Sequence, residues 1–301
     1  MLDSSVDDVA RPAAGGRATL ASLPAEPRRE IWFKHRVYLA TAFRELWEYK
    51  PLIRSLAERD IRIRYKQAVL GMAWALFTPI VMMLAFTLVF TKVGHVKTGG
   101  VPYPLFAYIA LIPWGFFSGS VLAGGMSLMS NISLLNKLYC PREVFPLGSV
   151  AVAAVDAFVA TLVLTVLFPI EHRAPHIEAL YIPLFLVTLV AFTVGVTLAA
   201  SAIVVYMRDL RVALPLVMQL ALFVTPVAYS ASTIAKTRTH LIIYSALNPL
   251  VAVLDGLRQT VLLGNQPDWT VQIVGLTTAL IVLAAGFLLF KRLETGLADI
   301  A

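Results

Sequence analysis

Long apolar runs separated by short polar segments dominate this chain from residue 68 onward. Six of these runs reach the length of about 18–25 apolar residues that a bilayer-spanning helix requires. They cover Ala68–Phe90, Leu105–Ser127, Val144–Phe168, Leu180–Tyr206, Val212–Tyr229 and Trp269–Phe290. Several contain Pro, which membrane bundles tolerate because neighbouring helices satisfy the freed backbone groups. The pattern predicts an all-α membrane protein with six transmembrane helices over residues 68–301.

The residues before the first apolar run divide into a polar tail and an amphipathic region. Residues 1–30 are rich in Ala, Arg, Pro and Gly and lack the apolar core of a signal peptide, so we expect a disordered cytoplasmic tail. Residues 31–66 mix aromatic and basic side chains, which favours helices lying at the membrane surface. Within them, Leu52–Lys66 separates apolar from charged positions on a helical wheel, although Asp60 and Arg64 interrupt its apolar half.

A short polar segment, Ser133–Phe145, lies between the second and third apolar runs. Pro141 suits the first turn of a helix, where its missing N–H costs nothing. Glu143 would then lie near the positive end of the helix dipole. Together with Lys137 and Arg142, these residues form either a surface for a partner or a simple charged helix connection.

The connection between the fifth and sixth runs is apolar enough over residues 241–263 to resemble a seventh span. Asn248 and Pro249 divide it into halves too short to cross, because they have the residue types of a helix N-cap and first helical position. Asp255 and Arg258 would each cost about 2.5–3.5 kcal/mol at mid-bilayer, and their i, i+3 spacing lets them pair. We expect an external helical hairpin, re-entrant or surface-lying; the alternative is a loop that only packs the bundle.

Composition and charge support a membrane location. The chain of 301 residues is 58% hydrophobic and 14% charged, whereas soluble domains have about 45–50% apolar and about 25% charged residues. Nineteen Lys and Arg residues fall on the side of the termini and of Ser133–Phe145, and six fall on the other side, so both termini are expected in the cytoplasm. This rule and anionic lipid explain the basic excess better than nucleic acid does. The single Cys140 excludes an intrachain disulfide, and no Cys/His cluster has metal-ligand spacing.

Few motifs with catalytic chemistry occur. The sequence has no Gly-x-x-x-x-Gly-Lys-Ser/Thr phosphate cradle, so this chain cannot hydrolyse ATP by that route. Asp156, an isolated acid near the centre of the third run, fits either a proton relay or a polar contact inside the bundle. Tyr103, Phe106, Trp114 and Phe117 share one face of the second run. Such a stripe fits stacking on sugar rings, but also core packing or an interfacial aromatic belt.

Several segments together resemble the membrane subunits of type-2 ABC exporters for polysaccharides, over about residues 50–301. This family includes the O-antigen, capsule and teichoic acid export permeases. The matching segments are Arg59–Gly71 running into Trp74 and Pro79, Pro113-Trp114, Tyr139–Val144, Asn248-Pro249 with Gly256-x-Arg258, and Leu293-Glu294 with Ala298-Asp299. The resemblance implies a homodimer with two ATPase subunits on its cytoplasmic side. ATP and Mg would be held by those subunits, and no cofactor is expected in this chain.

The resemblance also implies roles for particular residues. The basic helix would be an interface helix, and Asn136–Phe145 would be a coupling helix seated on each ATPase. Its expected contacts are Asn136, Tyr139, Pro141, Arg142 and Glu143. The aromatics expected to line or border a channel are Trp74, Phe77, Phe106, Trp114 and Phe117. The hairpin carrying Asn248, Pro249, Asp255 and Arg258 would narrow the external exit.

The expected function is export of a lipid-linked, O-antigen-like polysaccharide across the bacterial inner membrane. The chain would be a multi-pass transport subunit in contact with membrane lipids, and not itself an enzyme. One alternative within the same class is a type-2 exporter of a small molecule or lipid. Another is a channel or carrier that works without ATP, which would need ionisable groups inside the membrane and has only Asp156 to offer.

Overall fold

The computed structural model describes residues 47–66, 71, 73–90, 98–135, 140–207 and 209–294. These residues all belong to one unit, Leu39–Ala301. Every regular element within the described ranges is helical. The expected disordered tail, residues 31–46 of the amphipathic region, and the expected contacts Asn136 and Tyr139 lie outside the described residues.

Four described helices are long and apolar enough to cross a membrane, and two shorter apolar helices lie where the first and fifth runs were expected. The long ones are α5 (Tyr103–Ser130), α7 (Val144–Ile170), α8 (Ile182–Tyr206) and α13 (Trp269–Glu294), and the shorter ones are α4 (Ala73–Val89) and α9 (Leu210–Val224). The amphipathic helix is α3 (Lys50–Lys66). The remaining elements are α6 (Ile132–Leu135), η3 (Ile177–Tyr181), α10 (Ala231–Ile234), α11 (Arg238–Leu247), α12 (Pro249–Leu257) and the π-helical turn η4 (Arg258–Leu262).

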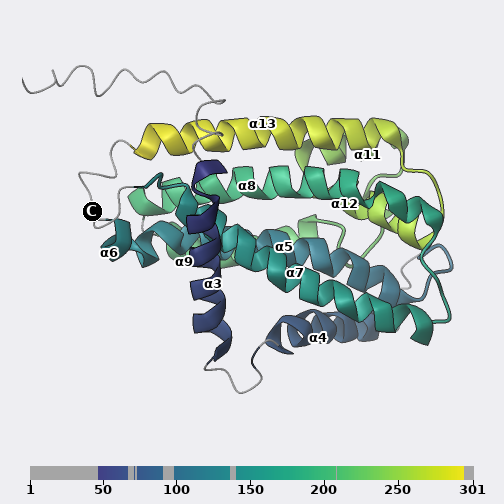
Figure 1. Cartoon of the computed structure of the whole chain (residues 1–301). Helices are drawn as coiled ribbons and strands as arrows, with labels where there is room; N and C mark the ends of the chain where they lie inside the picture. The colour runs from purple at the N-terminus through teal and green to yellow at the C-terminus, as the bar shows by residue number, and fades with distance from the viewer. Residues whose placement is uncertain are drawn as a thin grey trace, which may run out of the picture. The chain divides into compact units, whose positions relative to one another are not determined.

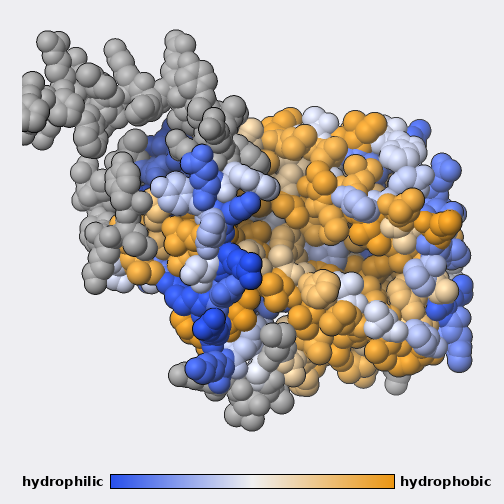
Figure 2. Space-filling view, in the orientation of Figure 1, coloured by the Kyte–Doolittle hydropathy of each residue, from blue (hydrophilic) through white to orange (hydrophobic). Residues whose placement is uncertain are grey.

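The long helices lie side by side, with α13 along α8 and α5 in contact with both α7 and α8, while α3 crosses α7 (Figure 1). In the most apolar 18-residue window of α5, 72% of residues are buried, against 28% in α7. Helix α5 is therefore the inner helix and α7 an outer one. Apolar residues cover the visible sides of α13, α8 and α7, and polar residues gather on α3 (Figure 2). Such an apolar outer surface suits lipid contact.

Glycines determine how closely these helices approach. A Cβ added to Gly286 of α13 would lie 2.1 Å from the carbonyl oxygen of Gly195, so α13 and α8 touch through their backbones. A Cβ on Gly124 of α5 would lie 2.2 Å from Cγ2 of Thr197 on α8. Small residues at helix contacts are typical of packing in bilayers, where close backbone approach supplies van der Waals energy. They hold α8 between α5 and α13.

Helix α9 ends at Val224, before the end of the run from which it was expected. Thr225 precedes Pro226 and has extended backbone angles, φ −86° and ψ 136°. A proline ring disfavours helical geometry in the residue before it. The expected span Val212–Tyr229 is therefore wrong over its last residues, which form an irregular buried segment.

The stretch that resembled a seventh span divides at Asn248, as expected. The Asn248 side chain accepts a hydrogen bond from the Leu250 N–H at 3.2 Å, and Pro249 begins α12. Gly264 follows the end of the π-helical turn with φ +66°, a left-handed conformation that glycine adopts without strain. Helix α12 contacts α5, α8, α11 and α13, and so it is buried nearly all round rather than on one face.

Candidate functional site

The segment between α6 and α7 places Arg142 and Glu143 against the C-terminal end of α13. Helix α7 begins at Val144, whose N–H donates to the Pro141 carbonyl at 3.2 Å, so Pro141 lies in a turn before the helix. The expectation that Pro141 occupies the first helical turn is wrong. The turn directs the Glu143 side chain inward, where it is 1% exposed and forms an ion pair with Lys291 of α13.

Further contacts bind the last turn of α13 to its neighbours. Arg142 Nη1 donates to the Glu294 carbonyl at 3.1 Å, and the Tyr206 hydroxyl of α8 donates to the Leu293 carbonyl at 2.6 Å. The Lys291 ammonium also pairs with the Glu294 carboxylate at 3.0 Å. The last carbonyls of a helix have no partner within the helix. Donors from two other parts of the chain therefore complete the end of α13.

The buried carboxylate of Glu143 has a mixed electrostatic environment. Burial raises its pKa and the neighbouring Glu294 carboxylate raises it further, whereas the Lys291 ammonium lowers it. One carboxylate oxygen, Oε2, has no hydrogen-bond partner among the described residues. Because a buried side chain has no surface to offer another protein, the direct ATPase contact expected for Glu143 is corrected to a contact within the chain.

Asp156 is held by the end of α3. The Arg64 guanidinium forms an ion pair with it at 2.7 Å, and the Tyr65 hydroxyl donates to it at 2.6 Å. Burial and the hydrogen bond to Asp156 raise the pKa of Tyr65 to about 12, so its hydroxyl stays protonated and able to donate. Asp156 therefore makes a polar contact inside the chain. This contact is one of the two roles that the sequence left open for it, the other being a proton relay.

A cavity of about 550 Å³ opens beside this cluster, between the end of α3 and helices α4, α5 and α7. Arg64, Tyr65 and Asp156 form its polar part, whereas its other walls are mainly apolar. Its apolar lining includes Trp74, Ala75, Pro79, Met82, Leu111, Ile112, Trp114, Gly115 and Phe116. A Cβ added to Gly115 would meet nothing within 4 Å, which marks this glycine as a point where the wall borders open space. The cavity therefore fits an amphipathic guest.

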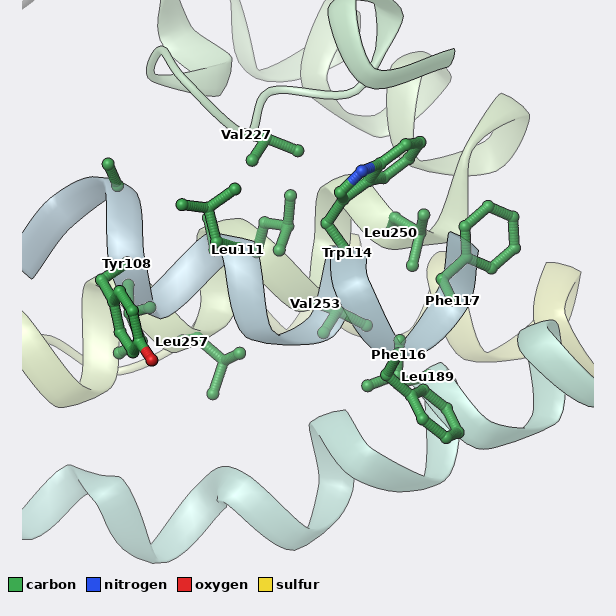
Figure 3. Packing of buried hydrophobic residues seen from close by; sticks show 14 of the residues in the cluster. Tyr108, Leu111, Trp114, Phe116, Phe117, Leu189, Val227, Leu250, Val253 and Leu257 are labelled. Carbon is green, nitrogen blue, oxygen red and sulfur yellow. The ribbon is translucent and has the colours of Figure 1, made fainter. Parts of the chain in front are cut away.

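The five expected channel aromatics occupy two environments. Phe106, Trp114 and Phe117 on α5 are buried, and Figure 3 shows Trp114 and Phe117 packed among other buried side chains of this chain. Trp74 and Phe77 on α4 are 47% and 50% exposed. Their rings meet edge to face, with the ring centroids 5.4 Å apart. The stripe on the second span is thus part of the core, while Trp74 and Trp114 also border the cavity.

Arg258, directly after α12, is 4% exposed. Its guanidinium donates to four backbone carbonyls, those of Phe106 (3.3 Å), Pro226 (2.7 Å), Val227 (2.5 Å) and Tyr229 (2.9 Å). Its central carbon lies 3.7 Å from the centroid of the Phe106 ring, a cation–π distance. The direct hydrogen-bond acceptors of this cation are therefore neutral carbonyl groups, and the Asp255 carboxylate acts on it only from a longer distance.

Three of these four carbonyls lie in the segment where α9 unwinds. Other carbonyls of the same region are satisfied by side chains too: the Tyr103 hydroxyl donates to Ala228 at 2.7 Å, and the Tyr244 hydroxyl donates to Val224. Irregular backbone at membrane depth is tolerated only where protein or water supplies such partners. Arg258 and the two tyrosines explain how the unwound segment can be buried.

Asp255 lies apart from the guanidinium hydrogen bonds. It lines a second cavity of about 450 Å³ with Asp268 and Trp269, at whose edge Arg238 forms two hydrogen bonds of 2.8 and 2.9 Å to the Asp268 carboxylate. The pairing expected between Asp255 and Arg258 is replaced by the contacts of Arg258 with carbonyls.

Sequence reasoning missed the partners that these residues find elsewhere in the chain. Lys291 entered only the count of positive charges, although a Lys in the last turn of an apolar helix is a candidate partner for an acid in a neighbouring turn. Arg64 left a clearer signal, because it interrupts the apolar half of the Leu52–Lys66 wheel. Neither signal identifies Glu143 or Asp156 as the partner, because such pairings depend on how distant segments pack.

Long apolar helices with polar clusters at their ends define a helical multi-pass membrane protein. Residues 51–262 match the ABC-2 type transporter family, and the chain belongs to that family, whose members are the membrane components of transporters. It is 32% identical over 212 residues to the O-antigen export system permease protein RfbA of Myxococcus xanthus, covering 70% of this chain and 80% of that protein.

Further relatives have similar names. The chain is 26% identical over 246 residues to the O-antigen export system permease protein RfbA of Klebsiella pneumoniae, covering 81% of this chain and 93% of that protein. It is 23% identical over 222 residues to the polysialic acid transport protein KpsM of Escherichia coli, covering 71% and 83% respectively. Each of these matches therefore covers most of this chain and most of the relative.

Proposed function

We propose that this chain is the membrane subunit of an ATP-driven exporter that moves a lipid-linked polysaccharide from the cytoplasm across the bacterial inner membrane. The observation that carries the proposal is the similarity to permeases named for O-antigen export, which extends over 70–81% of the chain. The relative named for polysialic acid transport supports a polymeric sugar as the cargo class. The chain itself would carry out no covalent chemistry on the sugar.

In this proposal two copies of the chain form a homodimer, and two ATPase subunits bind at the cytoplasmic face with their ATP and Mg. Six crossings, with α4 and α9 as the two short spans and both termini in the cytoplasm, put the segment between α6 and α7 at that face. Arg142 and Pro141, which are half-buried, together with Asn136 and Tyr139 would meet the ATPase. Glu143 would instead position this segment from inside the chain.

The cavity beside Asp156 would receive part of the cargo. Its apolar wall suits a lipid chain, and Arg64 and Tyr65 at its polar part suit the linkage to the first sugars. Trp74 offers an exposed indole face on which sugar rings can stack weakly and slide. The hairpin of α11 and α12 would re-enter the membrane from outside and narrow the exit, with Arg258 maintaining its structure.

The decisive experiment is mass spectrometry of the tagged chain purified from its native membrane in lipid nanodiscs. We expect an ATPase subunit in equal amount to the chain, and a lipid carrying a sugar polymer. An ATPase together with a small molecule or a sugar-free lipid would support the other type-2 function instead. A chain that co-purifies with no ATPase would contradict the proposal.

The single cysteine allows a direct test of the orientation. Cys140 lies in the segment assigned to the cytoplasm, and burial raises the pKa of its thiol, so its labelling should be slower than that of an exposed cysteine. A membrane-impermeant maleimide should label it in inverted membrane vesicles but not in intact spheroplasts. The matched control is Cys140→Ser with Asn265→Cys, in an exposed loop near the hairpin, which should show the opposite pattern. Labelling of Cys140 in spheroplasts would reverse the assignment.

A further inference from the structure

Helix α13 is attached to the residues just before α7 by two interactions. Lys291 pairs with the buried Glu143 carboxylate, and Arg142 donates to the Glu294 carbonyl at 3.1 Å. Lys291 also pairs with Glu294 at 3.0 Å, one turn further along the same helix. Residues separated by about 150 positions in the sequence are thereby joined in one cluster, which we call the α13 joint: Arg142, Glu143, Lys291 and Glu294.

The middle of α13 is in direct backbone contact with α8. The site lies at Gly286, where even a methyl group would overlap the Gly195 carbonyl. Glycine-mediated contact leaves little room for one helix to tilt independently of the other. We therefore expect a displacement applied to the α13 joint to move α13 together with α8.

The other end of α13 is bonded to the hairpin. Gln272 Nε2 donates to the Ala252 carbonyl of α12 at 2.8 Å, and a Cβ on Gly275 would lie 2.6 Å from the Ala252 Cβ. Helix α12 leads directly into Arg258, which is bonded to the unwound end of α9. A continuous series of close contacts thus connects the α13 joint to the hairpin.

We infer that α13 is the element that transmits movement of the segment between α6 and α7 to the hairpin, with Lys291 as the positioning residue of the joint. This inference rests on the proposed function, in which an ATPase moves that segment. The joint can exist in two arrangements, because Lys291 has two carboxylate partners, Glu143 and Glu294. When Glu143 moves away with its segment, Lys291 keeps Glu294, so the cation is not left unpaired.

A purely structural role predicts different behaviour. If the α13 joint only braces the fold, its loss lowers the amount of folded chain and alters ATPase binding, ATP hydrolysis and transport in proportion. If it transmits movement, its loss separates these activities: the ATPase still binds and hydrolyses ATP, while the hairpin no longer responds. Spatial continuity alone does not establish coupling, so the hairpin must be measured directly.

The test uses the whole complex with its ATPase, reconstituted in nanodiscs and proteoliposomes. Variants are Lys291→Gln, Glu143→Gln, and the reversed pair Glu143→Lys with Lys291→Glu, made together with Glu294→Gln so that the new carboxylate at position 291 does not face a second one. The matched control is Arg54→Gln, which removes an exposed ion pair with Glu58 on α3. The hairpin is followed by the maleimide-labelling rate of a cysteine at the exposed His240 of α11, in a Cys140→Ser background.

We expect ATP to change the labelling rate at position 240 in the unmodified joint. Lys291→Gln should abolish that change and lower export about ten-fold, within the usual range of coupling energies between sites, while ATP hydrolysis persists. The reversed pair should restore much of the ATP-dependent change in labelling and much of the export. Arg54→Gln should leave the labelling change and the export unaltered. If Lys291→Gln does not fold, Glu143→Gln, which has the same shape and leaves Lys291 paired with Glu294, takes its place and should show the same loss.

Three outcomes would overturn the inference: an ATP-independent labelling rate in the unmodified joint, normal coupling in Lys291→Gln, or a folded reversed pair that restores nothing. Failure of the proposed function gives a different result. If the cargo is not a polysaccharide, glycan export is absent from every complex including the unmodified one, whereas the response of position 240 to ATP still reports on α13.

Discussion

Two cations with little solvent exposure, Lys291 in the α13 joint and Arg258 directly after α12, are stabilised in different ways. The Lys291 side chain is 19% exposed and lies between two carboxylates, Glu143 and Glu294. Arg258 is 4% exposed and is surrounded by four backbone carbonyls and the ring of Phe106. At Lys291 the positive charge is neutralised by carboxylates. At Arg258 the positive charge is stabilised mainly by hydrogen bonds to backbone carbonyl groups.

The difference determines which site can change during a transport cycle. A carboxylate released from an ion pair can turn toward water or accept a proton, so the α13 joint has low-energy alternatives. Three of the four carbonyls bonded to Arg258 belong to the backbone of an unwound segment and have no helical partner to return to. Leaving a buried acceptor unsatisfied costs about 1–3 kcal/mol for each group. We therefore regard the Arg258 site as a permanent part of the fold.

Arg258→Leu should have the largest effect of any single change at these two sites. It removes the donor from four carbonyls at once, and we expect the free energy of unfolding to fall by more than about 4 kcal/mol, with most of the chain failing to fold. Size-exclusion profiles and thermal unfolding of the detergent-solubilised protein measure this. Arg258→Lys, which keeps the charge but has fewer donors, should lie between Leu and the original residue. Equal stability of all three proteins would show that the carbonyls find other partners.

Lys291→Met should be less destabilising, by about 3 kcal/mol near neutral pH, because the Glu143 carboxylate that it leaves unpaired can take up a proton, whereas a carbonyl group cannot. This loss should depend on pH. Glu143 without Lys291 has a pKa raised by burial and by Glu294, so the folded state binds a proton more readily than the unfolded state does. Stability then falls as pH rises from the ordinary Glu pKa of about 4.3 toward the raised value.

Thermal unfolding of Lys291→Met at pH 5 and pH 8 checks this directly. The variant should be closer to the unmodified protein at pH 5 than at pH 8. Arg258→Lys should show a deficit that changes less between the two pH values, because its carbonyl partners do not titrate and the nearby Asp255 carboxylate makes no direct ion pair with the guanidinium within the described residues. A deficit that is identical at the two pH values in both variants would remove the distinction between the two sites.

The sequence predicted elements well where a local rule operates. Asn248 and Pro249 divide the hairpin because a side-chain cap and a proline act on their own neighbours. The apolar runs gave the four long helices because hydrophobic length is a local property. Pro226 was also a local signal, and the fifth run was extended past it only because proline is tolerated in membrane helices.

Side-chain partners could not be predicted in the same way. Arg258 was expected to pair with Asp255 because the two are adjacent on a helix, but carbonyls from α5 and from the end of α9 compete for the guanidinium. Glu143 was expected on a surface because it lies in a polar segment, whereas packing against α13 buries it. Such outcomes depend on contacts between segments that are distant in sequence, and a single sequence carries no direct record of those contacts.

Gly115→Leu tests the role of the cavity beside Asp156. Gly115 lines the cavity of about 550 Å³, and a Cβ at this position has nothing within 4 Å, so the first carbon of the new side chain displaces no neighbour. We expect little change in thermal stability and a loss of export of about ten-fold or more, if the cavity holds cargo. Gly119→Ala, one turn along α5 and facing Ala153, is the matched control and should change neither property. Full export by a stable Gly115→Leu protein would exclude the cavity from the transport path.

The smallest effect is expected at Asp268, whose ion pair with Arg238 also joins a cation to a carboxylate but is more exposed than the α13 joint. The hydrogen bonds from Arg238 lower the pKa of Asp268, so the pair stabilises the fold above the ordinary Asp pKa of about 3.9, and this contribution is lost as pH falls through the lowered value. Water and salt screen exposed charges. Asp268→Asn should therefore shift the unfolding temperature barely at all near neutral pH, and added salt should erase what remains. A shift as large as that of Lys291→Met would mean that burial is not what distinguishes the α13 joint from an ordinary surface ion pair.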